Sequence, residues 1–139
     1  MKTKILIGCI VLLAFSACSS RYTNENSSFK ESIKPEKNEE DKWDLTVFDS
    51  QYEYFLTAIA RPKSQYSSSF LHSKNVQLVS EWNSYYHSGK YRNIIESSIE
   101  YDSSEKYDFD FEYKLYQVFA YVYWKYGLNF IWLSQADKR

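Results

Sequence analysis

The apolar positions after residue 43 recur mostly with the spacing of an α-helix. In four stretches, hydrophobic side chains return every three or four residues and would share one helix face. The stretches predicted to be helical are 50–60, 67–87, 91–99 and 109–130. In the last stretch, aromatic and aliphatic side chains occupy two faces, which is typical of a central helix covered on several sides.

Start and stop signals flank these stretches. Ser50 and Glu53 have the spacing of a capping box at the start of the first helix. Pro62 ends that helix, because the residue before a proline is disfavoured in the α region. Serines at 67–69 suit the N-cap region of the second helix, and Gly89 suits its C-terminal cap.

Strand signals are weak and lie near the start of the same region. The segment 45–48 is rich in β-prone residues and follows Trp43, so a short strand is expected there. Only Gly89 and Gly127 remain beyond the first 17 residues, which argues against a β-sandwich with many tight hairpins. The fold class predicted for 43–139 is therefore mainly α (α+β), with about four helices and one or two short strands near its start.

The beginning of the chain has the pattern of an export signal. Lys2 and Lys4 precede an apolar run at 5–15, which is too short for a spanning helix of about 20 residues and fits a secretory signal. Two small residues then precede Cys18, and this arrangement resembles the bacterial lipobox, with Phe15 where leucine is usual. We expect residues 1–17 to be a lipoprotein signal peptide and Cys18 to be the lipidation site.

Cysteine usage favours this interpretation. Cys9 would be removed with the signal, so Cys18 would be the only thiol of the mature chain, and acylation accounts for it. Several acyl chains of the palmitate class would anchor the protein stably. In lipoproteins that this signal resembles, aspartate after the cysteine marks retention in the inner membrane, so by this resemblance Ser19 implies transfer to the outer membrane. The expected location is therefore the cell envelope, with the membrane as partner. The alternative is an ordinary secretory signal in which Cys18 is incidental.

The stretch 18–42 is polar and predicts a disordered tether. It contains few apolar residues, mixes charges of both signs and includes Pro35, so it cannot bury enough surface to offset the entropy of ordering. The alternative is a partner-docking segment around Phe29 and Ile33. The folded domain is expected at 43–139.

Aromatic side chains are the unusual part of the composition. The chain has 14 tyrosines, 9 phenylalanines and 4 tryptophans, and their helical spacing favours a role in the core. The alternative is a platform of exposed rings that binds a glycan or an envelope protein. The rings selected as possible binding residues are Trp82, Tyr85, Tyr86, Tyr121, Tyr123, Trp124 and Trp132.

The sequence contains little that predicts catalysis. His72 and His87 lie too far apart in sequence to form a zinc motif on one helix, and an enzyme would require one of them in a pocket beside a carboxylate. Asp102, Asp108 and Asp110 could bind a cation such as calcium, or they could belong to a solvated loop that leads into a helix. We therefore predict no catalytic residue, no cofactor and no metal.

Charge excludes a nucleic-acid partner. Residues 43–139 carry 10 basic and 12 acidic side chains, and no basic stripe is present.

The chain also resembles an uncharacterised family of small bacterial envelope lipoproteins, which carry a domain of unknown function. The likeness extends over nearly all of 43–139. It rests on Trp43-Asp44-Leu45, Phe48-Asp49, Arg61-Pro62, Tyr66-Ser67, Leu71, Lys74-Asn75, Val79-Ser80-Glu81-Trp82-Asn83 and Tyr113-Lys114-Leu115-Tyr116. The resemblance implies no activity. We interpret the polar residues Asn75, Glu81 and Asn83 as bridges between helices and loops, and we expect Arg61 to pair with Asp49 or Glu81.

The function expected from the sequence is a non-enzymatic interaction or accessory module of the cell envelope, anchored by a lipid. The alternative is a glycan-binding module that uses exposed tyrosine and tryptophan rings.

Overall fold

The computed structural model describes residues 33–47 and 49–139, and in these ranges the fold is mainly α with a small antiparallel sheet. It contains three α-helices rather than four. The strands are β1 (Lys34–Lys37) and β2 (Trp43–Thr46), and the helices are α1 (Ser50–Ala58), α2 (Ser68–Ser88) and α3 (Phe109–Tyr126). Short 3-10 turns lie between α1 and α2, at Lys63–Gln65 (η2), and after α3, at Gln135–Asp137 (η3).

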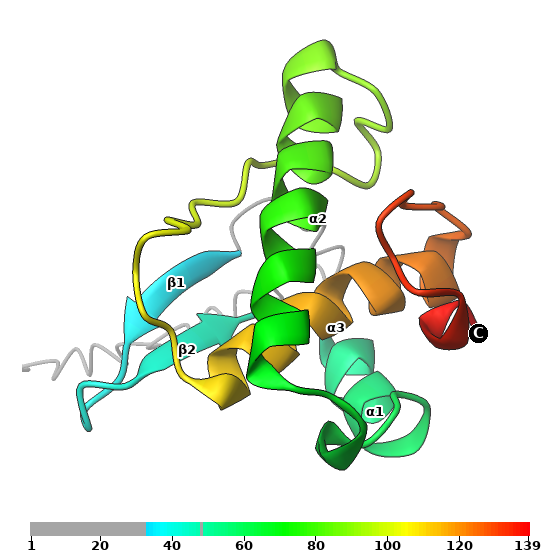
Figure 1. Cartoon of the computed structure of the whole chain (residues 1–139). Coiled ribbons are helices and arrows are strands. Elements are labelled where there is room, and N and C mark those ends of the chain that lie inside the picture. Colours follow the sequence, from blue (N-terminus) through cyan, green and yellow to red (C-terminus); the bar gives the residue numbers. More distant parts are fainter. Residues whose placement is uncertain (1–32, 48) are drawn as a thin grey trace, which may run out of the picture.

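Helix α3 is the centre of the domain (Figure 1). The long helix α2 crosses it, α1 packs near its C-terminal half, and the β1–β2 hairpin lies on the side of its N-terminal half. Every residue from Phe111 to Val122 except Lys114 is buried. The expectation of a central, largely aromatic helix is therefore confirmed.

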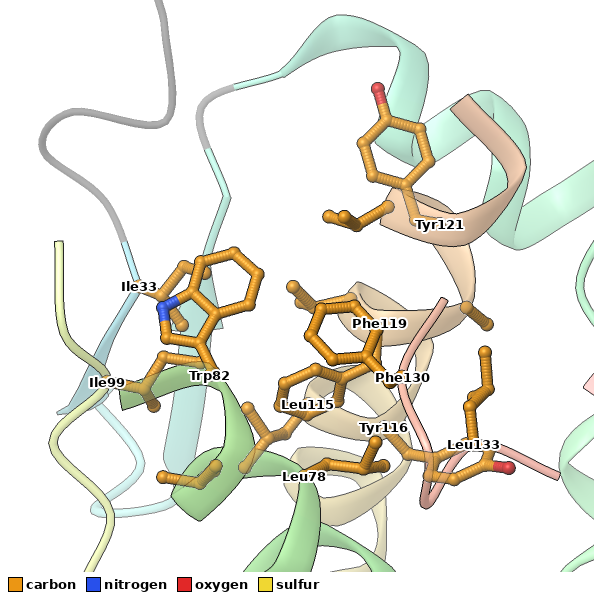
Figure 2. Close-up of a cluster of buried hydrophobic side chains, with 14 of the residues drawn as sticks. Ile33, Leu78, Trp82, Ile99, Leu115, Tyr116, Phe119, Tyr121, Phe130 and Leu133 are labelled. Carbon is orange, nitrogen blue, oxygen red and sulfur yellow. The ribbon is translucent and has the colours of Figure 1, made fainter. Parts of the chain in front are cut away.

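Aromatic rings from three parts of the chain form the middle of the core (Figure 2). The ring centroid of Trp82 on α2 lies 5.9 Å from that of Phe119 on α3 and 6.0 Å from that of Phe130, which follows α3. Phe119 and Phe130 meet edge to face at 5.4 Å. Because buried aromatic side chains remove about 150–250 Å² each from water, this cluster contributes strongly to the stability of the crossing.

Helix α2 begins and ends where its sequence signals predict. The side chain of Ser67 accepts a hydrogen bond from the amide of Phe70 as N-cap. Gly89 has the left-handed conformation with φ of 68°, and its amide donates to the carbonyls of Tyr85 and Tyr86. A Cβ at this glycine would meet only the guanidinium of Arg92, the movable end of an exposed side chain. Glycine is therefore required there for its left-handed conformation.

Helices α1 and α3 begin at Ser50 and Phe109 as predicted, but the N-cap of α1 and the last residue of each helix differ from prediction. Asp49, not Ser50, caps α1, because its carboxylate accepts from the amide of Gln51 at 3.0 Å. Helix α1 ends at Ala58, before the proline that was expected to stop it. Helix α3 ends at Tyr126 rather than at residue 130, because Gly127 adopts φ of 68° and closes the last turn.

The predicted helix at 91–99 is wrong. The segment is a turn followed by irregular chain, and Tyr91 has φ of 58°. Asn83 of α2 holds it as a neighbouring strand would, donating to the carbonyl of Ile99 at 2.9 Å and accepting from its amide at 2.8 Å. The indole of Trp82 donates to the carbonyl of Ser97 at 2.8 Å. Side chains of α2 thus satisfy backbone groups that a helix would have paired internally.

The predicted disordered tether is wrong for residues 33–42. Lys34–Lys37 pairs with Trp43–Thr46, with Lys34 opposite Thr46 and Lys37 opposite Trp43. The side chain of Asn38 organises the connecting turn by accepting from the amides of Glu40 and Lys42.

Strand β2 overlaps the β-prone segment expected at 45–48, and the side chain of Ile33 is 1% exposed within the core. The predicted signal peptide, Cys18, Phe29 and the rest of the tether lie outside the described residues.

No helix in the ranges 33–47 and 49–139 combines the length and the apolar character that crossing a membrane requires.

Candidate functional site

The most organised polar site of the described chain surrounds Glu112, in the first turn of α3. Its carboxylate is 3% exposed and accepts three hydrogen bonds. Oε1 accepts from the hydroxyl of Tyr101 at 2.9 Å and from Nδ1 of His72 at 3.0 Å, while Oε2 accepts from Nδ2 of Asn75 at 2.6 Å. Three donors compensate for removing the carboxylate from water.

The elements that position this site follow from the crossing of the two long helices. His72 and Asn75 are three residues apart on α2 and share the face that meets α3. Asn75 is fully buried and also donates to the backbone carbonyl of Glu112 at 2.8 Å. Tyr101 comes from the irregular chain between the helices, so three separate segments converge on one carboxylate.

The carboxylate fixes the orientation of the His72 ring. A carboxylate only accepts hydrogen bonds, so Nδ1 carries the proton in this arrangement and Nε2 is the free nitrogen of the neutral ring. The His72 side chain is 42% exposed, and no residue in 33–47 or 49–139 bonds to Nε2. The neutral imidazole can thus accept a hydrogen bond from outside the domain at Nε2.

A cavity of about 380 Å³ opens at this histidine. Its wall includes Ser68 and Ser69 of α2, Ser103, Glu105 and Lys106 of the connecting chain, and the ring of Phe109. A second cavity, of about 550 Å³, adjoins it and shares Ser103, Glu105 and Tyr107. Trp43, Glu100 and Asp102 lie on the wall of this second cavity.

A stack of rings holds the connecting chain that separates the cavities. The ring of Tyr107 lies 4.9 Å from that of Tyr101 and 4.4 Å from that of Phe111, and the edge contact with Trp43 is at 5.0 Å. Burial and the hydrogen bond to Glu112 raise the pKa of Tyr101 well above its ordinary value. Tyr101 therefore remains a hydrogen-bond donor to the carboxylate at any physiological pH.

The rings predicted as binding residues do not form one surface. Trp82 is fully buried, so its selection was wrong, and the ring of Trp124 packs against Phe55 at 5.6 Å. Tyr85 is half-buried and donates to Glu81 at 2.6 Å; burial and this bond raise its pKa to about 12.

The other rings selected from the sequence do not form a binding platform either. Tyr123 is half-buried and Tyr121 is buried in the core, whereas Tyr86 and Trp132 are 39% and 45% exposed. Trp132 lies 5.9 Å from the ammonium of Lys74, whereas the ring of Tyr86 contacts that of His87. These two exposed rings therefore have different neighbours.

The three aspartates considered for a cation have separate structural roles. Asp102 accepts from the amide and hydroxyl of Ser104, Asp108 caps α3, and Asp110 pairs with Lys63 at 2.6 Å. Across the described ranges no group of three acidic, histidine or cysteine side chains is placed to hold a metal ion.

The polar residues interpreted as bridges do act as bridges. Asn75 joins α2 to Glu112 of α3, and Asn83 joins α2 to the segment at Ile99. Glu81 accepts from the amide of Ile131 with both oxygens, at 3.0 and 2.9 Å, and so ties α2 to the chain after α3.

The partner predicted for Arg61 is wrong. Its guanidinium meets Asp137 at 3.3 Å, while Asp49 pairs with Lys125 instead. Asp137 is 5% exposed and also accepts from the hydroxyls of Tyr66 at 2.6 Å and Tyr116 at 2.7 Å. This buried carboxylate links η3 to α3 through the hydroxyl of Tyr116.

Sequence reasoning identified His72 but missed its partners. Glu112 belongs to the same acidic stretch as Asp108 and Asp110, where the helix dipole alone explains a negative charge. One signal was present: Glu112 stands one turn before Leu115 and Tyr116, on a helix with apolar residues on two faces. Such a position is buried, and a buried carboxylate requires donors.

Comparison with known proteins gives a family without an assigned activity. The sequence pattern of a family of unknown function (DUF6146) matches residues 5–138, and the chain belongs to this family. The search of curated proteins found no significant match, and neither did the search of solved structures.

Proposed function

We propose that this protein is a lipoprotein of the cell envelope, held at the outer membrane by acylated Cys18, with a domain that binds a ligand or partner without catalysis. The anchor is supported by the apolar run that precedes Cys18. It is also supported by the extent of the family match, which begins at residue 5 and therefore includes both the run and the cysteine.

The hairpin limits how far the domain would stand from the membrane. Cys18 and Ile33 are separated by 15 residue steps, which span at most about 50 Å when fully extended. Because Ile33 is packed in the core, the hairpin would be the part of the domain attached to the anchor. A ligand on the same membrane, or in the layer next to it, is within this reach.

The binding role is supported by the His72 site. An enzyme was expected to need a histidine in a pocket beside a carboxylate, and His72 beside Glu112 has this arrangement. However, no serine in 33–47 or 49–139 makes a hydrogen bond to its imidazole, whose partners there are Glu112 and Tyr101. An oriented nitrogen facing a cavity, without an attached nucleophile, favours recognition over covalent chemistry. The glycan alternative based on a platform of exposed rings has no comparable support.

The anchor is tested by the mass and solubility of the native protein. We expect Cys18 to carry acyl chains in the protein isolated from membranes, and the wild type to partition into detergent. Cys18→Ser should lose the modification and move to the aqueous phase. Cys9→Ser, which alters the other cysteine inside the apolar run, is the matched control and should behave as wild type. A native protein with a bare Cys18 thiol contradicts the proposal.

A further inference from the structure

We infer that the cavity beside His72 is a saccharide-binding site, in which Nε2 of His72 receives a hydrogen bond from a sugar hydroxyl. This inference deepens the proposed binding function by naming the ligand class. It does not depend on the lipid anchor, because it rests on the side chains around the cavity alone.

The hydrogen-bonding groups of the cavity match a ligand with many hydroxyls. Each sugar hydroxyl donates and accepts, so its site needs both kinds of partner. The hydroxyls of Ser68 and Ser103 provide both and make no hydrogen bond within the described ranges. Glu105 adds an acceptor and Lys106 adds a donor. The volume of about 380 Å³ falls in the range of small-molecule sites.

The charges around this cavity favour a neutral ligand. Glu105 and Lys106 carry opposite signs, while Glu112 keeps its charge and is hydrogen-bonded to three side chains of the domain. Carboxylates outnumber the one ammonium, so the cavity disfavours an anion, and a neutral ligand meets no opposing charge there. Hydrogen-bond geometry, rather than net charge, would determine what binds.

Aromatic rings supply the apolar part of the site. The half-buried ring of Phe109 lies on the cavity wall and can cover the C–H face of a sugar ring. The adjoining cavity offers Trp43 together with the carboxylates of Glu100 and Asp102. Because the two cavities share Ser103, an oligosaccharide could occupy both, with one unit in each.

The key side chain is already fixed before binding. Glu112 and Tyr101 both lie within 3.0 Å of Nδ1 of His72, so the ring orientation is set. Ordering a mobile side chain on binding costs about 0.5–1.5 kcal/mol, and a preset imidazole avoids most of that cost.

Histidine NMR tests the inference on the wild-type protein. The chain has two histidines, and His87 lies about 22 Å from His72 along α2, so it serves as an internal control. The full chain, in detergent micelles and labelled with ¹⁵N-histidine, is titrated with maltotriose, the trimer of N-acetylglucosamine, and putrescine. We expect one of the two saccharides to shift the Nε2 resonance of His72 saturably while His87 does not move.

Paired variants then test the role of the ring. His72→Gln should weaken saccharide binding by about 10-fold, through one lost hydrogen bond, and His87→Gln should leave it unchanged. The inference is overturned if neither saccharide shifts His72, if both histidines shift equally, or if His72→Gln binds as wild type. A response to putrescine alone would overturn it in favour of a cation site. None of these results depends on the state of Cys18.

Discussion

Replacing Asp137 by alanine should strongly destabilise the domain. The substitution leaves the hydroxyls of Tyr66 and Tyr116 without their acceptor and removes the partner of Arg61. Each unpaired buried donor costs about 1–3 kcal/mol, and breaking a buried ion pair costs about 3–5 kcal/mol. Because all three donors share one carboxylate, these costs overlap, and we expect a loss of about 3–5 kcal/mol.

The matched control is an ion pair at the surface. Asp110 and Lys63 approach more closely, at 2.6 Å, but their side chains are 67% and 48% exposed. Such a pair contributes about 0–1 kcal/mol, so Asp110→Ala should change stability little. A difference between the two variants would show that burial, not the length of the contact, determines the cost.

Urea unfolding followed by tryptophan fluorescence and far-ultraviolet circular dichroism measures both variants. With a slope of about 2 kcal/mol per molar, Asp137→Ala should lower the midpoint by about 2 M. The reasoning is refuted if the two variants lose equal stability, or if Asp137→Ala loses less than about 1 kcal/mol.

Two further predictions concern the contacts of α2 and α1. Asn83→Ala should cost about 2–4 kcal/mol in urea unfolding, because it leaves the amide and carbonyl of Ile99 unpaired, whereas the exposed Asn93→Ala should cost almost nothing. The second prediction is a pH dependence at Asp49. Burial is the largest single influence on Asp49 and opposes its ionisation. The hydrogen bonds from Lys125, Tyr121 and the amide of Gln51, with the charge of Lys125, together outweigh it and lower the pKa of that carboxyl. A lowered folded-state pKa stabilises the domain above about pH 4 and loses this effect as the pH falls through the folded value. The unfolding midpoint should therefore fall between pH 5 and pH 3, and Asp49→Asn should flatten this fall; an unchanged slope would contradict it.

The parts of the fold that the sequence predicted are those determined by local interactions. Helix α2 has a serine at its N-cap and a glycine at its left-handed C-cap, and both act within one turn of chain. The apolar pattern of α3 also identified it as the central helix, since two hydrophobic faces require neighbours on two sides.

The parts that were missed depend on contacts between distant residues. Ile94, Ile95 and Ile99 have helical spacing, but β-branched residues lower helix propensity, and Asn83 supplies the backbone partners that favour an extended path. The strand at 34–37 is polar, so composition alone indicated disorder, and its order comes from pairing with β2.

The candidate site also combines a feature that the sequence predicted with contacts between distant residues that it did not. His72 could be selected from the sequence because the chain has only two histidines, but its partner Glu112 is 40 residues away. Only the crossing of α2 over α3 brings these side chains together, and no periodicity of either helix specifies that contact.

The pairing of Lys34 with Thr46 determines how the domain would respond to mechanical tension. The N-terminal end of β1 and the C-terminal end of β2 lie at the same end of the ladder. A force that pulls on the chain before β1 would separate β1 from β2 starting at this end. The backbone hydrogen bonds between the two strands would break one after another rather than all at once. Ile33 would leave the core and the hairpin would open before the rest of the domain. The segment between the anchor and the domain would then be longer, while the crossing of α2 and α3 stayed intact.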